Sequence, residues 1–133
     1  MSLKFSTAVR NAELDAIETT IGTFPFINLY TGGSPANITD GATGLLLAQV
    51  FLPSDWMNAA SSGTKTKLGT WSASAIDTGV AGYFRMLSSG SVAGIQGGVS
   101  GSAGGADMIL DNTNIVVAQT VTIATFTLTG GNA

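Results

Sequence analysis

The chain contains no cysteine and no histidine among its 133 residues. Without cysteine there is no disulfide framework, no thiolate nucleophile and no thiolate metal ligand. Without histidine the chain also lacks the side chain that most often moves protons near neutral pH and most often binds metals. These two absences exclude the commonest zinc sites and every catalytic centre built on cysteine or histidine.

Charge is also scarce. Only 10% of the residues are charged, and the balance of 5 basic against 8 acidic residues gives a formal net charge of -3, whereas about 25% of a typical soluble domain is charged. A protein that binds nucleic acid needs a positive stripe to contact phosphates. The basic residues are instead scattered, so we expect no nucleic-acid partner: Lys4, Arg10, Lys65, Lys67 and Arg85.

Long hydrophobic runs are missing. The longest apolar stretch, residues 45–52, contains Gln49 and is far shorter than the roughly 20 residues of a membrane span. The N-terminus has no apolar core typical of a signal peptide. We therefore expect a soluble chain with no membrane partner. Its hydrophobic content of 44% and mean hydropathy of +0.36 predict a folded chain, and its length fits a single core.

One amphipathic helix is predicted near the N-terminus. Within residues 8–21 apolar side chains recur at steps of three and four, the period of a helix with one buried face. Ser6 or Thr7 can cap its start, and Gly22 can end it. We expect residues 1–22 to form a helical arm whose apolar stripe needs a partner surface. Residues 23–133 then form a separate β domain.

Seven short runs rich in β-forming residues follow the helix. Gly, Ser, Asn and Asp separate them, as in the turns of β proteins. This pattern of short strands and turns predicts a mainly β fold, an antiparallel β-sandwich or jelly-roll-like domain. The expected strands are residues 26–31, 44–52, 64–75, 80–87, 92–99, 108–110 and 115–129.

Two of these strands carry further information. Residues 45–52 are apolar on both faces, which indicates that the helix or another subunit covers the outer face. In the last strand the apolar residues occupy odd positions up to Ile123 and even positions from Phe126. Such a change of phase predicts a β-bulge or a change of packing partner.

No catalytic or metal-binding motif is convincing. Ser62 and Lys65 have the Ser-x-x-Lys spacing of a serine activated by lysine, but that spacing works on a helix and here favours a solvated turn. Asp107 and Asp111 lie near asparagines without the calcium-loop pattern, so we interpret them as turn residues. We expect no cofactor, no metal and no enzymatic activity.

The aromatic residues allow two interpretations. Trp56, Trp71, Tyr30 and Tyr83 can bind a sugar if they face outward together, because their rings offer flat apolar area with a polar edge. Packing in the core or at an interface is favoured in a chain with 8% aromatic residues.

Two groups of charges are expected to be structural. Arg85 lies within an apolar strand, and we expect it to pair with Asp77 or with a carboxylate of a neighbouring chain. The acidic residues Glu13, Asp15 and Glu18 are expected to form the solvated face of the helix.

Several segments resemble one protein family. They are residues 5–18, Leu-Pro-Ser-Asp-Trp-Met at residues 52–57, Gly-Tyr-Phe-Arg at residues 82–85, Asp-Met-Ile-Leu-Asp-Asn at residues 107–112, and the ending from residue 121. Together they are similar to a family of small structural proteins of tailed bacteriophages and prophages. The resemblance implies a virion structural protein, a capsid cement or decoration protein. The alternative is a tail or fibre component with a β-sandwich that binds a carbohydrate or receptor.

The implied partners are the major capsid protein and copies of the chain itself, with a trimer as one arrangement. The protein would be made in the host cytoplasm and reside on the capsid surface. We expect its interface to use apolar residues of the helix and of two strands: Phe5, Val9, Leu14, Ile17, Ile21, Leu46, Phe126 and Leu128.

Overall fold

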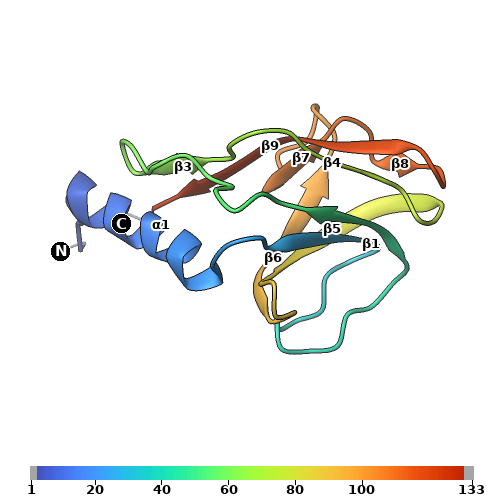
Figure 1. Ribbon diagram of the computed structural model, residues 1–133, viewed down its shortest axis with the longest axis horizontal. Coiled ribbons are helices and arrows are strands. Elements are labelled where there is room, and N and C mark those ends of the chain that lie inside the picture. The colour runs from blue at the N-terminus through green and yellow to red at the C-terminus, as the bar shows by residue number, and fades with distance from the viewer. Residues whose placement is uncertain (1–2, 131–133) are drawn as a thin grey trace.

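The computed structural model describes residues 3–130 and consists of one helix followed by nine strands (Figure 1). The elements are α1 (Thr7–Ile21), β1 (Phe26–Thr31), β2 (Leu46–Phe51), β3 (Thr64–Thr66), β4 (Trp71–Ser74), β5 (Gly79–Leu87), β6 (Ala93–Ser100), β7 (Met108–Leu110), β8 (Asn114–Ile115) and β9 (Thr120–Thr129).

The strands form a curled sheet with two layers that enclose the core. One layer has the order β2-β1-β5-β6, and the other contains β7 and β9, with β3 and β4 both paired to β9. The predicted mainly β, sandwich-like fold is confirmed. One strand pairing departs from the predicted antiparallel arrangement, because β6 and β7 pair in parallel, Val99 with Met108 and Ser100 with Ile109. The glycine-rich residues 101–107 are too few for a long crossover, so the parallel pairing is limited to these strand ends.

The helix begins and ends where the sequence predicts. The Ser6 hydroxyl accepts a hydrogen bond from the Val9 amide at 3.3 Å, and Gly22 has a φ of 87°, which favours glycine. The Gly22 amide donates to the Glu18 carbonyl at 2.9 Å. The helix lies at one end of the two layers, where it packs against β3 (Figure 1).

Two predicted strands are each divided by a turn. Residues 64–75 form β3 and β4, with Gly69 at a φ of 80° between them. Residues 115–129 contain the end of β8 and all of β9, separated by a turn in which Ala118 has a φ of 69°. The alternation of side chains continues through both turns in the sequence, so periodicity alone does not reveal them.

The predicted irregularity in the last strand is confirmed. Ile109 pairs with Thr125 while Leu110 pairs with Ile123, so Ala124 is an extra residue in β9. The bulge allows Ile123 and Phe126 both to point into the core despite the change of phase.

Aromatic rings fill the space between the layers. The Phe126 ring lies 5.7 Å from Trp71 and 5.6 Å from Phe84, measured between centroids. Trp56 and Trp71 are buried and donate their indole N–H groups to backbone carbonyls, each at 3.0 Å. Core packing of both tryptophans is therefore confirmed. Phe126, expected at an interface, is only 1% exposed; we correct this position to the core, because the bulge turns its ring inward.

We expect Phe126→Ala to lower the free energy of unfolding by about 3–5 kcal/mol, because the substitution leaves a cavity among packed rings. Denaturant unfolding of the isolated chain measures this change. The matched control is Phe51→Ala, since Phe51 is 69% exposed, and its effect should be within about 0.5 kcal/mol. Equal effects of the two substitutions would contradict the assignment of Phe126 to the core.

Candidate docking surface

An apolar row crosses the outer face of the β2-β1-β5-β6 layer. Side chains alternate between the two faces of a strand, and Ile27, Leu29 and their partners occupy the core face. On the opposite face Phe26 pairs with Phe51 on one side and with Leu87 on the other, and Leu87 pairs with Ala93. We call these four residues, Phe51, Phe26, Leu87 and Ala93, the apolar row.

The apolar row is open to solvent at one end and half-buried elsewhere. Phe51 is 69% exposed, whereas the other three residues are half-buried. The Phe26 and Phe51 rings lie 5.5 Å apart. This aromatic pair, on the edge strand β2 and its neighbour β1, gives the outer face of the layer an apolar surface.

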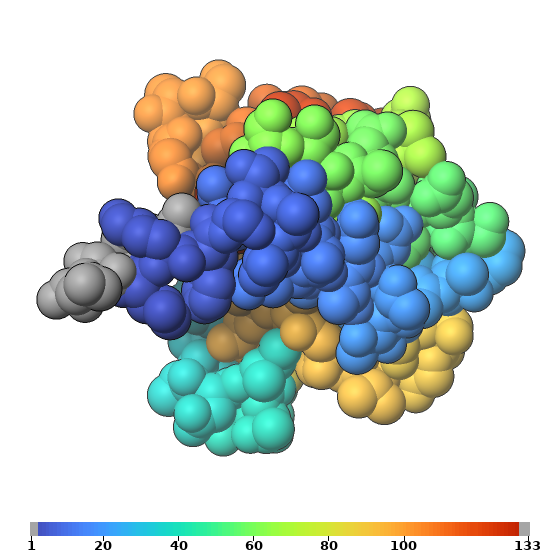
Figure 2. Space-filling view, turned by 90° about the vertical axis from the view of Figure 1, so that its left-hand side faces the viewer, coloured from blue at the N-terminus to red at the C-terminus, as the bar shows by residue number. Residues whose placement is uncertain are grey.

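A groove beside the helix continues this surface. One hollow of about 270 Å³ lies between the helix and the start of β6, and a second of about 350 Å³ adjoins it. Ile21 and Gly94 line both hollows, and Ala93 belongs both to the second hollow and to the apolar row. The helix crosses the face shown in Figure 2, which views this side of the molecule. We call this feature the helix groove; its lining is Glu13, Ala16, Ile17, Thr20, Ile21, Ser88, Val92, Ala93 and Gly94.

Glycine at position 94 permits the close approach of helix and strand. A Cβ atom there would lie 3.1 Å from Cγ1 and 3.4 Å from Cδ1 of Ile21. A larger residue would press on the Ile21 side chain, which packs against the core at this point. The shape of the helix groove therefore depends on this glycine.

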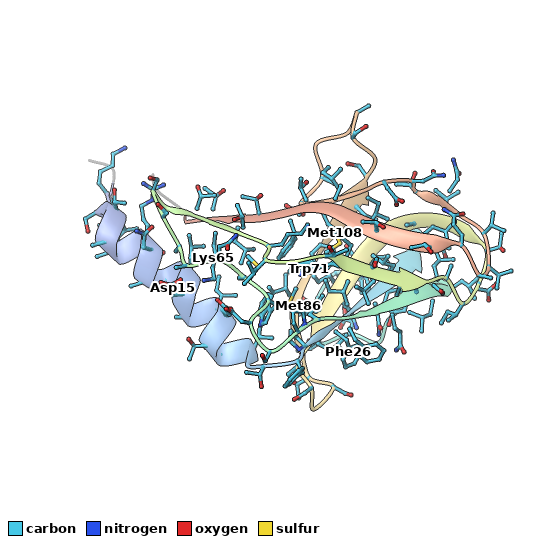
Figure 3. All side chains as sticks on the ribbon, turned by 45° about the horizontal axis from the view of Figure 1, so that its top comes forward. Asp15, Phe26, Lys65, Trp71, Met86 and Met108 are labelled. Carbon is cyan, nitrogen blue, oxygen red and sulfur yellow. The ribbon has the colours of Figure 1, made fainter. Side chains whose placement is uncertain are left out.

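A buried lysine holds the helix in place. The Lys65 side chain, on β3, is 1% exposed, and its Nζ atom lies 2.7 Å from Asp15 Oδ1 and 2.7 Å from Glu18 Oε2 (Figure 3). Asp15 Oδ1 also accepts a hydrogen bond from the Ala60 amide at 3.0 Å. We call Lys65, Asp15 and Glu18 the lysine latch. Our expectation that both carboxylates form only the solvated face is corrected: Asp15 stays 50% exposed and Glu18 is half-buried, but both pair with Lys65, because its burial requires opposite charges beside it.

The latch determines which helix residues face outward. Leu14, on the same side as Glu18, is only 2% exposed, so we correct its assignment from the interface to the chain's own packing. Ile17 and Ile21 are half-buried at the edge of the helix groove. Val9 and Phe5 are 45% and 38% exposed.

The latch also fixes the protonation of Lys65. Burial lowers the pKa of Lys65, but hydrogen bonds and charges from Asp15 and Glu18 outweigh that effect, and the pKa is raised. The hydrogen bond from Lys65, together with the one from the Ala60 amide, lowers the pKa of Asp15. The Lys65 ammonium is thus paired with two carboxylates, and Lys65 lies buried on β3 rather than in a solvated turn.

The two remaining interface candidates lie elsewhere. Leu46 is half-buried and pairs with Tyr30. Leu128 is half-buried, packs against the core and lines a separate hollow of about 380 Å³ beside β6. Phe26 and Phe51 were not predicted as interface residues. The apolar character of both faces of residues 45–52 was the available signal for Phe51, whereas Phe26 joins it only through strand pairing.

The four aromatic residues do not form an exposed platform. Trp56, Trp71 and Tyr83 are at most 1% exposed. Tyr30 is half-buried and stacks on Tyr83 at 5.0 Å. The favoured interpretation of these rings as packing residues is therefore confirmed for three of the four.

The remaining polar candidates have structural contacts. Asp107 accepts a hydrogen bond from the Gly98 amide at 3.3 Å, and Asp111 accepts one from the Asn112 amide at 2.8 Å, as turn residues do. Across residues 3–130 there is no group of three or more acidic side chains that could hold a metal ion. The same residues contain no helix long and apolar enough to cross a membrane.

Comparison with protein families, curated proteins and solved structures found no match to this chain.

We expect the contribution of the lysine latch to the free energy of unfolding to be constant around neutral pH. Asp15, whose pKa is lowered, contributes stability that is full above its unfolded-state pKa and lost as the pH falls through its folded-state pKa. Lys65, whose pKa is raised, contributes stability that is full below its unfolded-state pKa and lost as the pH rises through its folded-state pKa. The difference in unfolding free energy between wild type and Lys65→Met should be constant from about pH 5 to 9 and shrink outside this range. A difference that varies across neutral pH would contradict the latch.

Removal of the lysine and neutralisation of the two carboxylates should lower the Tm by different amounts. In Lys65→Met the carboxylates can turn toward water from the half-exposed helix, so we expect a fall in Tm of about 5 °C. In the double variant Asp15→Asn and Glu18→Gln the lysine stays buried without an opposite charge, and we expect a larger fall. Glu13→Gln, on the exposed side of the same helix, is the control and should leave Tm unchanged. Thermal unfolding followed by circular dichroism measures all three.

Proposed function

We propose that this chain is a non-enzymatic virion structural protein that binds an assembled phage head shell as a cement or decoration protein. The observation that carries the proposal is the continuity of the apolar row with the helix groove. Together they form an uncharged surface that is interrupted only by Glu13 at the groove rim. Contiguous exposed apolar surface of this kind marks protein interaction sites.

Aromatic side chains give this surface most of its binding capacity. Phe51 and the half-buried Phe26 lie side by side, and interfaces are enriched in aromatic residues at their centres. Covering a fully exposed phenylalanine contributes roughly 1.5–3 kcal/mol. Ile17, Ile21 and Val92 at the groove add further apolar area.

The distribution of charge favours a protein partner over a nucleic acid. Lys65 and Arg85 are buried, and Lys67 lies 5.8 Å from the centre of the Trp71 ring. The exposed carboxylates of the described residues are Glu13, Asp15, Asp40, Asp55, Asp77, Asp107 and Asp111. Lys4 is exposed and Arg10 and Lys67 are half-buried, so exposed carboxylates outnumber exposed cations, and this balance disfavours contact with phosphate groups.

The proposed mechanism is stabilisation by mass action. A protein that binds across neighbouring subunits of the shell, and not to free subunits, favours the assembled state. Copies of this chain placed around a three-fold position of the shell would form a trimer, with the major capsid protein as the second partner. The protein would then reside on the outer surface of the capsid.

The alternative function, a tail or fibre component that binds a carbohydrate or receptor, has less support. It requires Trp or Tyr rings on one exposed face, and three of the four are buried. We therefore retain the shell as the proposed partner.

Co-sedimentation with empty capsids tests the proposal. We expect the wild-type chain to bind at a fixed ratio to the major capsid protein, and Ile17→Asp and Phe51→Asp each to weaken binding at least tenfold, because each buries an unpaired charge at the interface. Val116→Asp is the matched control, since Val116 is 56% exposed and follows β8 at the end of the sheet away from the helix (Figure 1); it should bind like wild type.

Light scattering and thermal unfolding establish that each variant has the wild-type mass and is folded. Two results would overturn the proposal: a wild-type chain that forms stable oligomers and ignores capsids, or equal binding by all the variants. The first result would move the protein to the tail or fibre.

A further inference from the structure

A polar row lies directly beside the apolar row on the same outer face. Asn28 pairs with Gln49 on one side and with Arg85 on the other, and Arg85 pairs with Gln96. We call these four residues, Gln49, Asn28, Arg85 and Gln96, the polar row. Each lies two or three positions along its strand from the residue of the apolar row. Asn28 and Arg85 at its centre are 7% and 6% exposed.

Arg85 is a buried cation without an opposite charge. We expected an ion pair with Asp77 or with a carboxylate of a neighbouring chain; within residues 3–130 Arg85 forms no ion pair, so the pairing with Asp77 is wrong. Its Nε donates to Gln96 Oε1 at 2.7 Å, and its Nη2 donates over 3.5 Å to the Asn37 carbonyl. Asp40, on the same covering segment, accepts hydrogen bonds from Asn37 instead. A buried guanidinium held only by neutral acceptors is unfavourable for the isolated chain.

Asn28 provides a second, independent observation. Its Nδ2 donates to the Tyr30 hydroxyl at 3.1 Å, while its Oδ1 is buried without a hydrogen-bond partner. Buried acceptors without partners are rare in folded proteins. The centre of the polar row therefore lacks two complementary groups, an anion for Arg85 and a donor for Asn28.

The segment of residues 32–45 covers the polar row. It connects β1 to β2 across the outer face (Figure 1). Near the row it is held by Gln96, which donates to the Pro35 carbonyl at 3.0 Å, and by the long contact from Arg85 to Asn37. Displacing the Asn37 carbonyl would cost little, since a hydrogen bond of 3.5 Å is weak.

We propose that the polar row binds one acidic residue of the protein subunit that docks on the apolar row. The carboxylate accepts hydrogen bonds from Arg85 in place of the Asn37 carbonyl, and a backbone N–H beside it donates to Asn28 Oδ1. A peptide supplies both groups, whereas a free phosphate or acetate supplies only the anion. The location of the partner rests on the function proposed above, but the binding chemistry of the row does not.

Asn28→Asp gives a direct test, because it places a carboxylate opposite Arg85 within the chain. We expect this variant to have a higher Tm than wild type and at least tenfold weaker binding to empty capsids, since the guanidinium is already paired. Arg85→Met should also lose binding while its Tm stays equal or rises. Asn114→Asp and Lys67→Met, which make the same charge changes elsewhere, should bind like wild type.

A measurement without capsids separates this inference from the proposed function. The nitrogen–proton signal of Arg85 Nε should shift saturably on addition of a blocked Gly-Asp-Gly peptide, but not of a blocked Gly-Asn-Gly peptide, and Asn28→Asp should abolish the shift. If the wild-type chain ignores capsids and still binds the acidic peptide, the proposed function fails and the inference stands.

Three results would overturn the inference. In the first, Asn28→Asp binds capsids like wild type. In the second, Arg85→Met lowers Tm, as loss of a purely structural residue would. In the third, sodium acetate shifts the Arg85 signal as strongly as the acidic peptide does.

Discussion

The charge pair between β3 and the helix determines how the rest of the surface is arranged. Lys65 cannot be buried without opposite charges, and Asp15 and Glu18 provide them one helical turn apart. Once both carboxylates point at β3, the rotation of the helix about its axis is fixed. Ile17 and Ile21 must then lie beside Gly94, at the rim of the helix groove. A polar contact thus places the apolar residues that a partner would meet.

The outer face of the sheet reverses the usual distribution of polar and apolar residues. Most soluble proteins cover apolar side chains and leave polar ones in water. Here residues 32–45 cover Asn28 and Arg85, whereas Phe51 stays exposed. The register of β1 with its neighbours places the two rows side by side. This arrangement leaves part of the apolar row in solvent and conceals Arg85 beneath residues 32–45.

The parts of the fold that depend on local signals could be predicted from the sequence. Periodicity and capping residues predicted the helix from Ser6 to Gly22, and the change of phase predicted the bulge at Ala124. The turn at Ala118 and the parallel pairing of β6 with β7 could not be predicted, because neither changes the alternation of side chains. The candidate site was predicted only in part. Ile17 and Ile21 follow from helix periodicity, but Phe26 joins Phe51 only through strand pairing.

The predictions of exposure were wrong for Leu14 and Lys65 for the same reason. Hydrophobicity alone assigned Leu14 to an outward stripe and Lys65 to solvent, but burial depends on what the tertiary structure places beside each residue. Leu14 is covered because the latch draws its side of the helix toward β3. The neighbouring groups also distinguish Lys65 from Arg85. Both cations are buried, but two carboxylates of the chain itself satisfy the lysine, whereas only neutral groups contact the arginine. A charge satisfied within the chain stabilises the fold, and one left unpaired beside an apolar surface is suited to select a partner.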